Sequence, residues 1–148
     1  MSSEYPRHIR FLCDKCAKCC GDTNERVRTI LMLKSESARI SKETGLSIGE
    51  FSERAGGFEP YTYHVRKTQN GKCVFLKGNL CSIYEIRPLI CRFYPFKLEN
   101  IGNDRYVFSC TDECPGIGNG NRLDKAFYEN LFAEFKKAMK ENVHRKPT

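Results

Sequence analysis

The stretch CDKCAKCC, residues 13–20, places four cysteines within eight positions of a 148-residue chain. Two residues separate Cys13 from Cys16 and Cys16 from Cys19, and this spacing lets the chain curl so that successive sulfurs face one centre. Bacterial ferredoxins combine three such cysteines with a distant Cys-Pro, and this chain has Cys114-Pro115. Four thiolates suit zinc equally well. The stretch therefore predicts a metal site and leaves open whether the metal is zinc or iron.

The expected compartment bears on how the nine cysteines are used. The first residues, MSSEYPRHIRF, lack the apolar segment of a secretory signal, so we expect a cytoplasmic protein. In a reducing cytosol, grouped cysteines bind metal more often than they form disulfides. The longest aliphatic run, residues 30–33, is far shorter than the roughly 20 residues of a membrane helix, so we expect no membrane span.

The adjacent pair Cys19 and Cys20 suggests how the cysteines divide. Neighbouring side chains of an extended segment leave on opposite faces, so one centre would not take both easily. The chain then has either two sites that share this stretch or one site with an extra reactive thiol at its edge. For two sites, the first set is Cys13, Cys16, Cys19 and Cys114, and the second set is Cys20, Cys73, Cys81 and Cys91. Cys110 remains as a surplus thiol or a competing fourth ligand.

A simpler interpretation treats Cys73, Cys81 and Cys91 as small buried hydrophobic residues, as free cysteines often are. The number of cysteines and the leading spacing favour ligation for the set as a whole. The three histidines, His8, His64 and His144, stand at no close step from a cysteine, so we expect solvated or hydrogen-bonded imidazoles.

The formal net charge of +7 raises the possibility of a nucleic-acid partner. Metal ligation deprotonates thiols, so eight thiolates would add eight negative charges and two divalent ions four positive ones. The charge would fall to +3 from the +7 of the metal-free chain. This correction argues against a nucleic-acid partner and leaves a moderately basic surface for a protein partner or protein substrate.

The residue pattern predicts an α+β fold, with residues 1–148 as one small metal-stapled domain and a frayed tail from about residue 144. Apolar residues recur at steps of three and four between residues 123 and 143, which indicates a long amphipathic helix. We expect its aromatic stripe to pack on the rest of the domain rather than to bind a cofactor.

Shorter elements are expected before this helix. Residues 27–33 predict a strand, and a helix should run from Ser35, as its cap, to a stop at Gly45. Ser47 and Glu50 form a capping box for a two-turn helix that ends near residues 56–57. Hairpin turns are expected at three places: residues 70–71, 77–79 and 102–104. Short helical turns should flank Pro88, and the glycines of GIGNG, residues 116–120, should let the backbone wrap a metal.

Taken together, CDKCAKCC, CVFLKGNLCSIYEIRPLICRFYPF and CPGIGNG resemble the YkgJ-like cysteine-cluster family of zinc- or iron-chelating domains, named for its CxxCxxCC pattern. The resemblance spans most of the chain. It implies eight ligands: Cys13, Cys16, Cys19, Cys20, Cys73, Cys81, Cys91 and Cys114. Cys110 would be additional. The family includes a domain of flagellin lysine N-methylases, larger enzymes that are thought to hold an iron–sulfur cluster.

Three functions are compatible with these observations. The first is a cytosolic protein with one or two cysteine-ligated centres, with an iron–sulfur cluster favoured over zinc, that serves a modification or redox reaction. The second is a structural zinc-stapled interaction module with a basic surface. The third, a lysine N-methylase-like enzyme, rests on the resemblance alone, and no pair of nucleophile and base identifies an enzyme. Arg87 and Arg92 flank Cys91, where we expect them to support the centre by donating hydrogen bonds to sulfur, by offsetting its charge or by holding a carboxylate or phosphate of a ligand.

Overall fold

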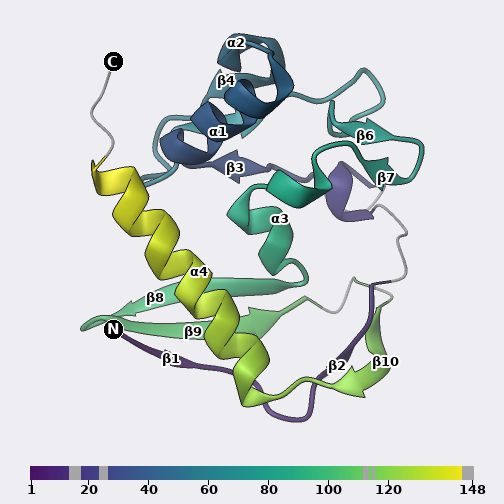
Figure 1. The fold of residues 1–148 in the computed structure, drawn as a ribbon. Coiled ribbons are helices and arrows are strands. Elements are labelled where there is room, and N and C mark those ends of the chain that lie inside the picture. Colours follow the sequence, from purple (N-terminus) through teal and green to yellow (C-terminus); the bar gives the residue numbers. More distant parts are fainter. Residues whose placement is uncertain (14–17, 24–26, 112–113, 115, 145–148) are drawn as a thin grey trace.

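The computed structural model describes residues 1–13, 18–23, 27–111, 114 and 116–144. It contains helices and short sheets in an α+β arrangement, as predicted. Figure 1 shows two groups of elements, with α3 (Leu89–Phe93) between them. The first group is a sheet covered by a long helix, and the second holds α1 and α2 above smaller sheets.

The first group is built on a three-stranded sheet in the order β1-β9-β8. Its strands are β1 (Ser2–Glu4), β8 (Phe96–Gly102) and β9 (Arg105–Cys110). The predicted hairpin turn is confirmed, because Gly102, Asn103 and Asp104 all have positive φ angles and glycine, asparagine and aspartate tolerate such angles best. No pattern in the sequence indicated β1, which adds to β9 in parallel.

The long helix α4 (Lys125–His144) confirms the predicted amphipathic segment. Its buried aromatic residues Tyr128 and Phe132 join Leu89, Phe93 and residues of the sheet in one hydrophobic cluster, which we call the aromatic core. Tyr128 is 1% exposed, and its ring stacks on Tyr5 with 4.6 Å between ring centroids. The aromatic stripe therefore packs against the sheet, as expected.

The second group surrounds a separate cluster, the aliphatic core, which includes Ile30, Met32, Ile40, Phe51 and Cys73. Its three-stranded sheet has the order β3-β5-β4, and the helices α1 and α2 pack beside it. The elements are β3 (Leu31–Met32), α1 (Lys34–Thr44), α2 (Ile48–Phe51), β4 (Ser52–Arg54) and β5 (Tyr63–Val65).

Several local predictions for this group need correction. The strand predicted for residues 27–33 is reduced to β3, and α2 has one turn rather than two because β4 begins at Ser52. The cap of α1 is Leu33, not Ser35, and the Glu36 carboxylate accepts the Leu33 N–H at 2.9 Å. The stop at Gly45 is confirmed by its φ angle of 76°.

Glu36 has a second contact that holds the two groups together. Its other carboxylate oxygen accepts the backbone N–H of Leu89, at the start of α3. Burial raises the pKa of the Glu36 carboxyl above its ordinary value, although both N–H donors and the nearby Arg92 oppose that shift. A buried acid thus connects α1 to the helix that lies between the two cores.

Two hairpin turns, two 3₁₀ turns and two short strand pairs complete the described structure. The turns predicted at residues 70–71 and 77–79 are confirmed by the positive φ angles of Gly71 and Gly78. However, β5 pairs with β3 and β4 rather than with the residues that follow the first turn. The remaining elements are the 3₁₀ turns Lys18–Cys20 and Tyr84–Ile86, the pair β6 (Leu76–Lys77) and β7 (Leu80–Cys81), and the pair β2 (Arg10–Phe11) and β10 (Ile117–Arg122).

Candidate metal centre

Four cysteines gather on one side of the aliphatic core. Cys73 is 8% exposed and belongs to that core, while Cys20, Cys81 and Cys91 pack against it. Cys20 lies in the 3₁₀ turn Lys18–Cys20, and Cys73 follows the hairpin turn at residues 70–71. Cys81 lies in β7 and Cys91 lies in α3. These are the four members of the second set predicted from the sequence. Cys19 lies beside them, because its Sγ is 4.0 Å from the Sγ of Cys20.

The geometry around Cys19 and Cys20 corrects one premise of the sequence analysis. The pair lies in a 3₁₀ turn rather than in an extended segment. Successive side chains of such a turn do not point to opposite faces, and the two sulfurs are therefore close. The expected separation of the two thiols between two faces is wrong, so all five cysteines of this group can be considered for one centre.

A close approach between two backbone segments positions Cys20 next to Cys73. The Cys73 N–H donates to the Cys20 carbonyl at 2.6 Å, and the Asp22 N–H donates to the Gly71 carbonyl at 2.8 Å. Gly21 lies between these bonds, and a Cβ there would stand 2.5 Å from the Gly71 carbonyl oxygen. Glycine at this position is what allows the cysteine-rich turn to lie against the hairpin.

Asp22 fixes the chain on the far side of Gly21. Its carboxylate accepts the Arg28 backbone N–H at 2.7 Å and pairs with Lys67 at 2.8 Å. The hydrogen bond from Lys67 is the main reason that the pKa of Asp22 is lowered. These contacts hold Arg28, which the sequence analysis did not single out, close to the cysteines.

The five thiols differ in how readily they ionise. Burial raises the pKa of the Cys91 thiol to about 12 and also raises the pKa of Cys73 and Cys81. The hydrogen bond between Cys19 and Cys20 lowers the pKa of Cys19 to about 6 and raises that of Cys20. One thiolate shared by this pair and three neutral thiols is the expected charge state at neutral pH.

Two arginines provide positive charge to this group. Both Arg28 and Arg87 contribute to the lowered pKa of Cys19. Arg28 also opposes the rise in the pKa of Cys91 that burial causes, and Arg87 opposes the rise for Cys81. The predicted place of Arg87 beside the cysteines agrees with this charge effect. Arg92 instead lies on the side facing α4, where its Nη1 is 3.7 Å from Glu134. No sequence signal marks Arg28, which stands eight residues beyond Cys20 and outside any cysteine motif.

The first predicted set is not brought together in the part of the chain that the structure describes. Cys16 lies outside the described residues, and Cys19 is with the second set. Cys13 is exposed and Cys114 is 8% exposed. The strands β2 and β10 bring their backbones near each other, since the Leu12 N–H donates to the Gly116 carbonyl at 3.1 Å. Cys110 packs against the aromatic core.

Two of the glycines after Cys114 lie close to the segment that precedes Cys13. A Cβ on Gly116 would lie 2.4 Å from the Leu12 carbonyl oxygen, and one on Gly120 would lie 2.8 Å from the Leu12 Cβ. These glycines therefore permit the close pairing of β10 with that segment. Their expected role in wrapping a metal stays a prediction.

The two histidines whose side chains the structure describes do not add to the cysteine group. His64 lies in β5, and its Nδ1 is 3.4 Å from the Val65 carbonyl oxygen. His8 is exposed at the surface. The side chain of His144 is outside what the structure describes. The expectation of hydrogen-bonded or solvated imidazoles agrees with the described positions of His8 and His64.

The described cysteine thiols have the chemistry that zinc and iron require, but their sulfur atoms do not surround a common point. Of the described residues, no three cysteine, histidine, aspartate or glutamate side chains stand close enough to hold an ion. None of the described cysteines forms a disulfide. We call Cys19, Cys20, Cys73, Cys81 and Cys91 the five-thiol group. Sulfur ligation by this group would therefore require side-chain rotation together with loss of protons.

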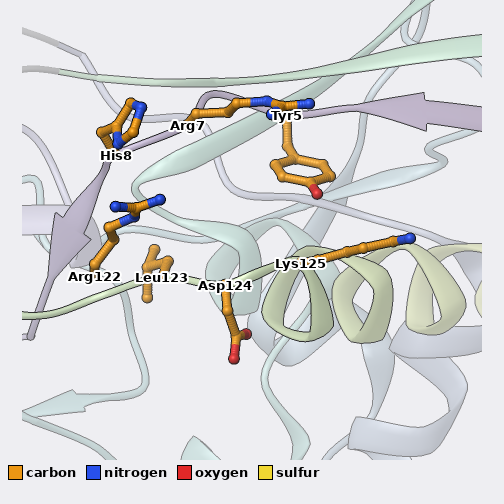
Figure 2. Close-up of a pocket in the computed structure, with 7 residues that line it drawn as sticks. All are labelled: Tyr5, Arg7, His8, Arg122, Leu123, Asp124 and Lys125. Carbon is orange, nitrogen blue, oxygen red and sulfur yellow. The ribbon is translucent and has the colours of Figure 1, made fainter.

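A basic pocket of about 310 Å³ lies elsewhere, at the start of α4. Figure 2 shows Arg122 extending toward His8 and Arg7, whereas Asp124 points away from them. Lys125 pairs with Glu129 at 3.5 Å. Arg7, His8 and Arg122 form no ion pair with any acid among the described residues, so positive charge is concentrated there.

No described helix combines the length and apolar character needed to cross a membrane. No solved structure gives a significant match to the chain. An uncharacterized protein of Methanocaldococcus jannaschii, MJ0661, is 31% identical over 97 residues, which cover 64% of this chain and 50% of that protein. The chain thus spans about half the length of the curated relative that it matches.

The family model described as "CxxCxxCC: Putative zinc- or iron-chelating domain" matches residues 12–115. That segment contains all nine cysteines, including the five that the fold gathers. The match confirms the family resemblance and agrees with the expectation of a zinc or iron cofactor. The chain belongs to the CxxCxxCC family of zinc- or iron-chelating domains.

Proposed function

We propose that this protein binds one cysteine-ligated metal centre in the five-thiol group, with an iron–sulfur cluster favoured over zinc. Cys20, Cys73, Cys81 and Cys91 would be the ligands. The observation that supports this proposal is their common position against the aliphatic core, reached from four separate segments. A site of this kind would tie those segments together in a way that apolar packing of such short elements cannot.

The protein's own residues would prepare and stabilise this centre. Arg28 and Arg87 offset the negative charge of thiolates, because both already favour ionisation of cysteines in the group. Cys19 would supply a thiolate at the edge, as an alternative ligand or as a partner in exchange. A bound iron–sulfur cluster would contribute electron transfer, whereas zinc would contribute structural stability.

A second centre would use Cys13, Cys16 and Cys114 from the first predicted set. The pairing of β2 with β10 supports this proposal only at the level of the backbone near Cys13 and Cys114. Cys110 packs against the aromatic core and would be the surplus thiol rather than a ligand. We also propose that residues 1–148 act as one cytosolic domain, because α3 contributes to both cores.

Metal analysis and an absorption spectrum of protein purified without oxygen or chelator test the main proposal. We expect bound iron with a brown colour, or zinc in a colourless protein. Cys73→Ser should remove most of this metal, whereas the matched variant Cys110→Ser should retain it. Cys16→Ser then reports on the second centre. Equal metal content in Cys73→Ser and Cys110→Ser would refute the proposed ligand set.

The basic pocket favours a second candidate function, an interaction module stapled by zinc. Arg7, His8 and Arg122 would contact an acidic segment of a protein partner. A synthetic peptide rich in glutamate is a suitable probe, and its affinity should fall steeply as salt rises. Binding that is unchanged in Arg122→Gln would exclude this pocket.

A further inference from the structure

A cavity of about 390 Å³ lies between the two cores and is separate from the basic pocket. Its walls come from α3, the start of β8, α4 and the segment before β3. Most of them are apolar, and they include Leu89, Ile90, Phe93, Phe96, Leu98 and Phe135. A volume of this size accommodates a small organic molecule.

Arg28 gives this apolar cavity a positive charge. Among the described residues, two other charged residues line it, Lys97 and Glu99, and both are exposed at its rim. The Arg28 Nε donates to the Cys19 carbonyl at 3.2 Å, and the guanidinium carbon is 5.1 Å from the centroid of the Tyr94 ring. The guanidinium is therefore held in place by contacts that use only part of its donor capacity.

The guanidinium of Arg28 is only partly paired. Nη2 is buried and has no hydrogen-bond partner among the described residues. Buried polar groups are usually paired, and a guanidinium nitrogen without a partner is especially unfavourable. Arg28 lines the cavity wall, so an anionic group that enters the cavity could accept a hydrogen bond from the guanidinium.

The walls restrict the chemistry of that anion. A dianionic phosphate would need several cations, but within the described part of the chain it would meet one arginine, one rim lysine and the carboxylate of Glu99. A single carboxylate needs only one guanidinium, whose planar fork matches it well. The remaining cavity surface favours an aromatic or branched apolar body.

We propose that this cavity binds a small organic acid whose carboxylate contacts Arg28 and whose apolar body lies against α3 and β8. Because Arg28 also contacts the Cys19 backbone, the carboxylate lies next to the five-thiol group. The inference rests on the proposed function in one respect: the proposed metal centre would lie beside the bound acid. Binding of the acid itself depends only on the cavity and Arg28.

The test uses 3-phenylpropionate as the probe and its amide, 3-phenylpropanamide, as a neutral molecule of the same shape. Saturation-transfer NMR and calorimetry on the full chain, as purified, should show that the acid binds at least tenfold more tightly than the amide. An N-acetylated peptide that ends in phenylalanine distinguishes the sources of the carboxylate. Tighter binding of that peptide than of the free acid assigns the site to a protein C-terminus.

Arg28→Gln should weaken binding of the acid at least tenfold and leave the amide unaffected. Arg54→Gln is the matched control, because Arg54 also stacks on a tyrosine, with 5.9 Å to the Tyr63 centroid, but does not line the cavity. Leu98→Trp fills the apolar part without altering Arg28 and should block both molecules. Thermal unfolding of each variant verifies that it is folded.

Equal affinity for acid and amide, or no binding of either, would overturn the inference. So would an Arg28→Gln variant that changes metal content alone, since Arg28 would then serve only the thiols. Metal content is measured on the same samples. If the purified protein contains no metal but binds the acid, the proposed function is refuted and the cavity assignment stands. If the protein contains metal but does not bind the acid, the cavity assignment is refuted and the proposed function stands.

Discussion

The replacement Gly21→Ala tests how the chain brings Cys20 and Cys73 together. An added Cβ would lie 2.5 Å from the Gly71 carbonyl oxygen and 2.7 Å from the Lys72 Cα. Both atoms belong to the backbone, so no flexible side chain can move aside to relieve the contact. The cysteine-rich turn would have to separate from the hairpin.

The cost of this separation follows from the contacts that flank Gly21. Two backbone hydrogen bonds would lengthen, from Cys73 to Cys20 at 2.6 Å and from Asp22 to Gly71 at 2.8 Å. Each such bond contributes about 1 kcal/mol, and overpacking of a close contact costs about 1–3 kcal/mol. We therefore expect the free energy of unfolding to fall by about 3–5 kcal/mol. Metal content should fall as well, because Cys20 and Cys73 are proposed to bind the same centre.

Urea denaturation and metal analysis measure the two effects on the same preparations. Gly49→Ala is the matched control, because Gly49 lies in α2 and a Cβ added there would meet no atom within 4 Å. That change should stabilise the protein by about 0.5 kcal/mol, since alanine reduces the freedom of the unfolded chain. If Gly21→Ala matches the control in both stability and metal content, the close approach does not assemble the site.

Two further predictions concern buried ionisable or polar groups. The pKa of Glu36 is raised, so its contribution to stability is complete below the ordinary glutamate pKa and is lost as pH rises through the folded-state pKa. The stability gap, which is the free energy of unfolding of wild type minus that of Glu36→Gln, should therefore become smaller as pH rises from about 4 upward. Denaturation at several pH values measures this gap, Glu50→Gln serves as an exposed capping control, and a gap that widens would contradict the prediction. Tyr128→Phe should raise the free energy of unfolding by about 1 kcal/mol, because the buried Tyr128 hydroxyl has no hydrogen-bond partner among the described residues. A loss of stability in this variant would reveal a partner for that hydroxyl.

The elements that could be predicted from the sequence are those with a strong local signal. The long helix α4 has a clear apolar periodicity, and the turns at Gly71, Gly78 and Gly102 carry residues that favour positive φ angles. The parallel strand β1 could not be predicted, because its pairing with β9 depends on a partner about one hundred residues away. The same holds for β10, because its position depends on the close approach of Gly120 to the distant backbone near Leu12 and not on a local sequence pattern.

The sequence predicted the four cysteines of the second set as a group, but not that Cys19 lies beside them. Cysteine spacing alone indicated which residues could bind metal, and the fold places four members of the second set against one core. The conformation of the Cys19–Cys20 pair could not be inferred from adjacent positions, since the same two residues are far apart in a strand and close in a 3₁₀ turn. Arg28 was missed because its position depends on Asp22, whose carboxylate holds the Arg28 backbone.

The packing of the thiols also bears on the two interpretations of the buried cysteines. Neutral thiols behave as small hydrophobic groups, and burial raises the pKa of Cys73, Cys81 and Cys91, which keeps them neutral. The aliphatic core can therefore contain these cysteines before any metal is bound. Ligation would then replace protons by an ion at positions where the backbone already holds the sulfurs near one another. A cysteine such as Cys73 can thus be both a core residue and a ligand, and burial by itself does not argue against metal binding.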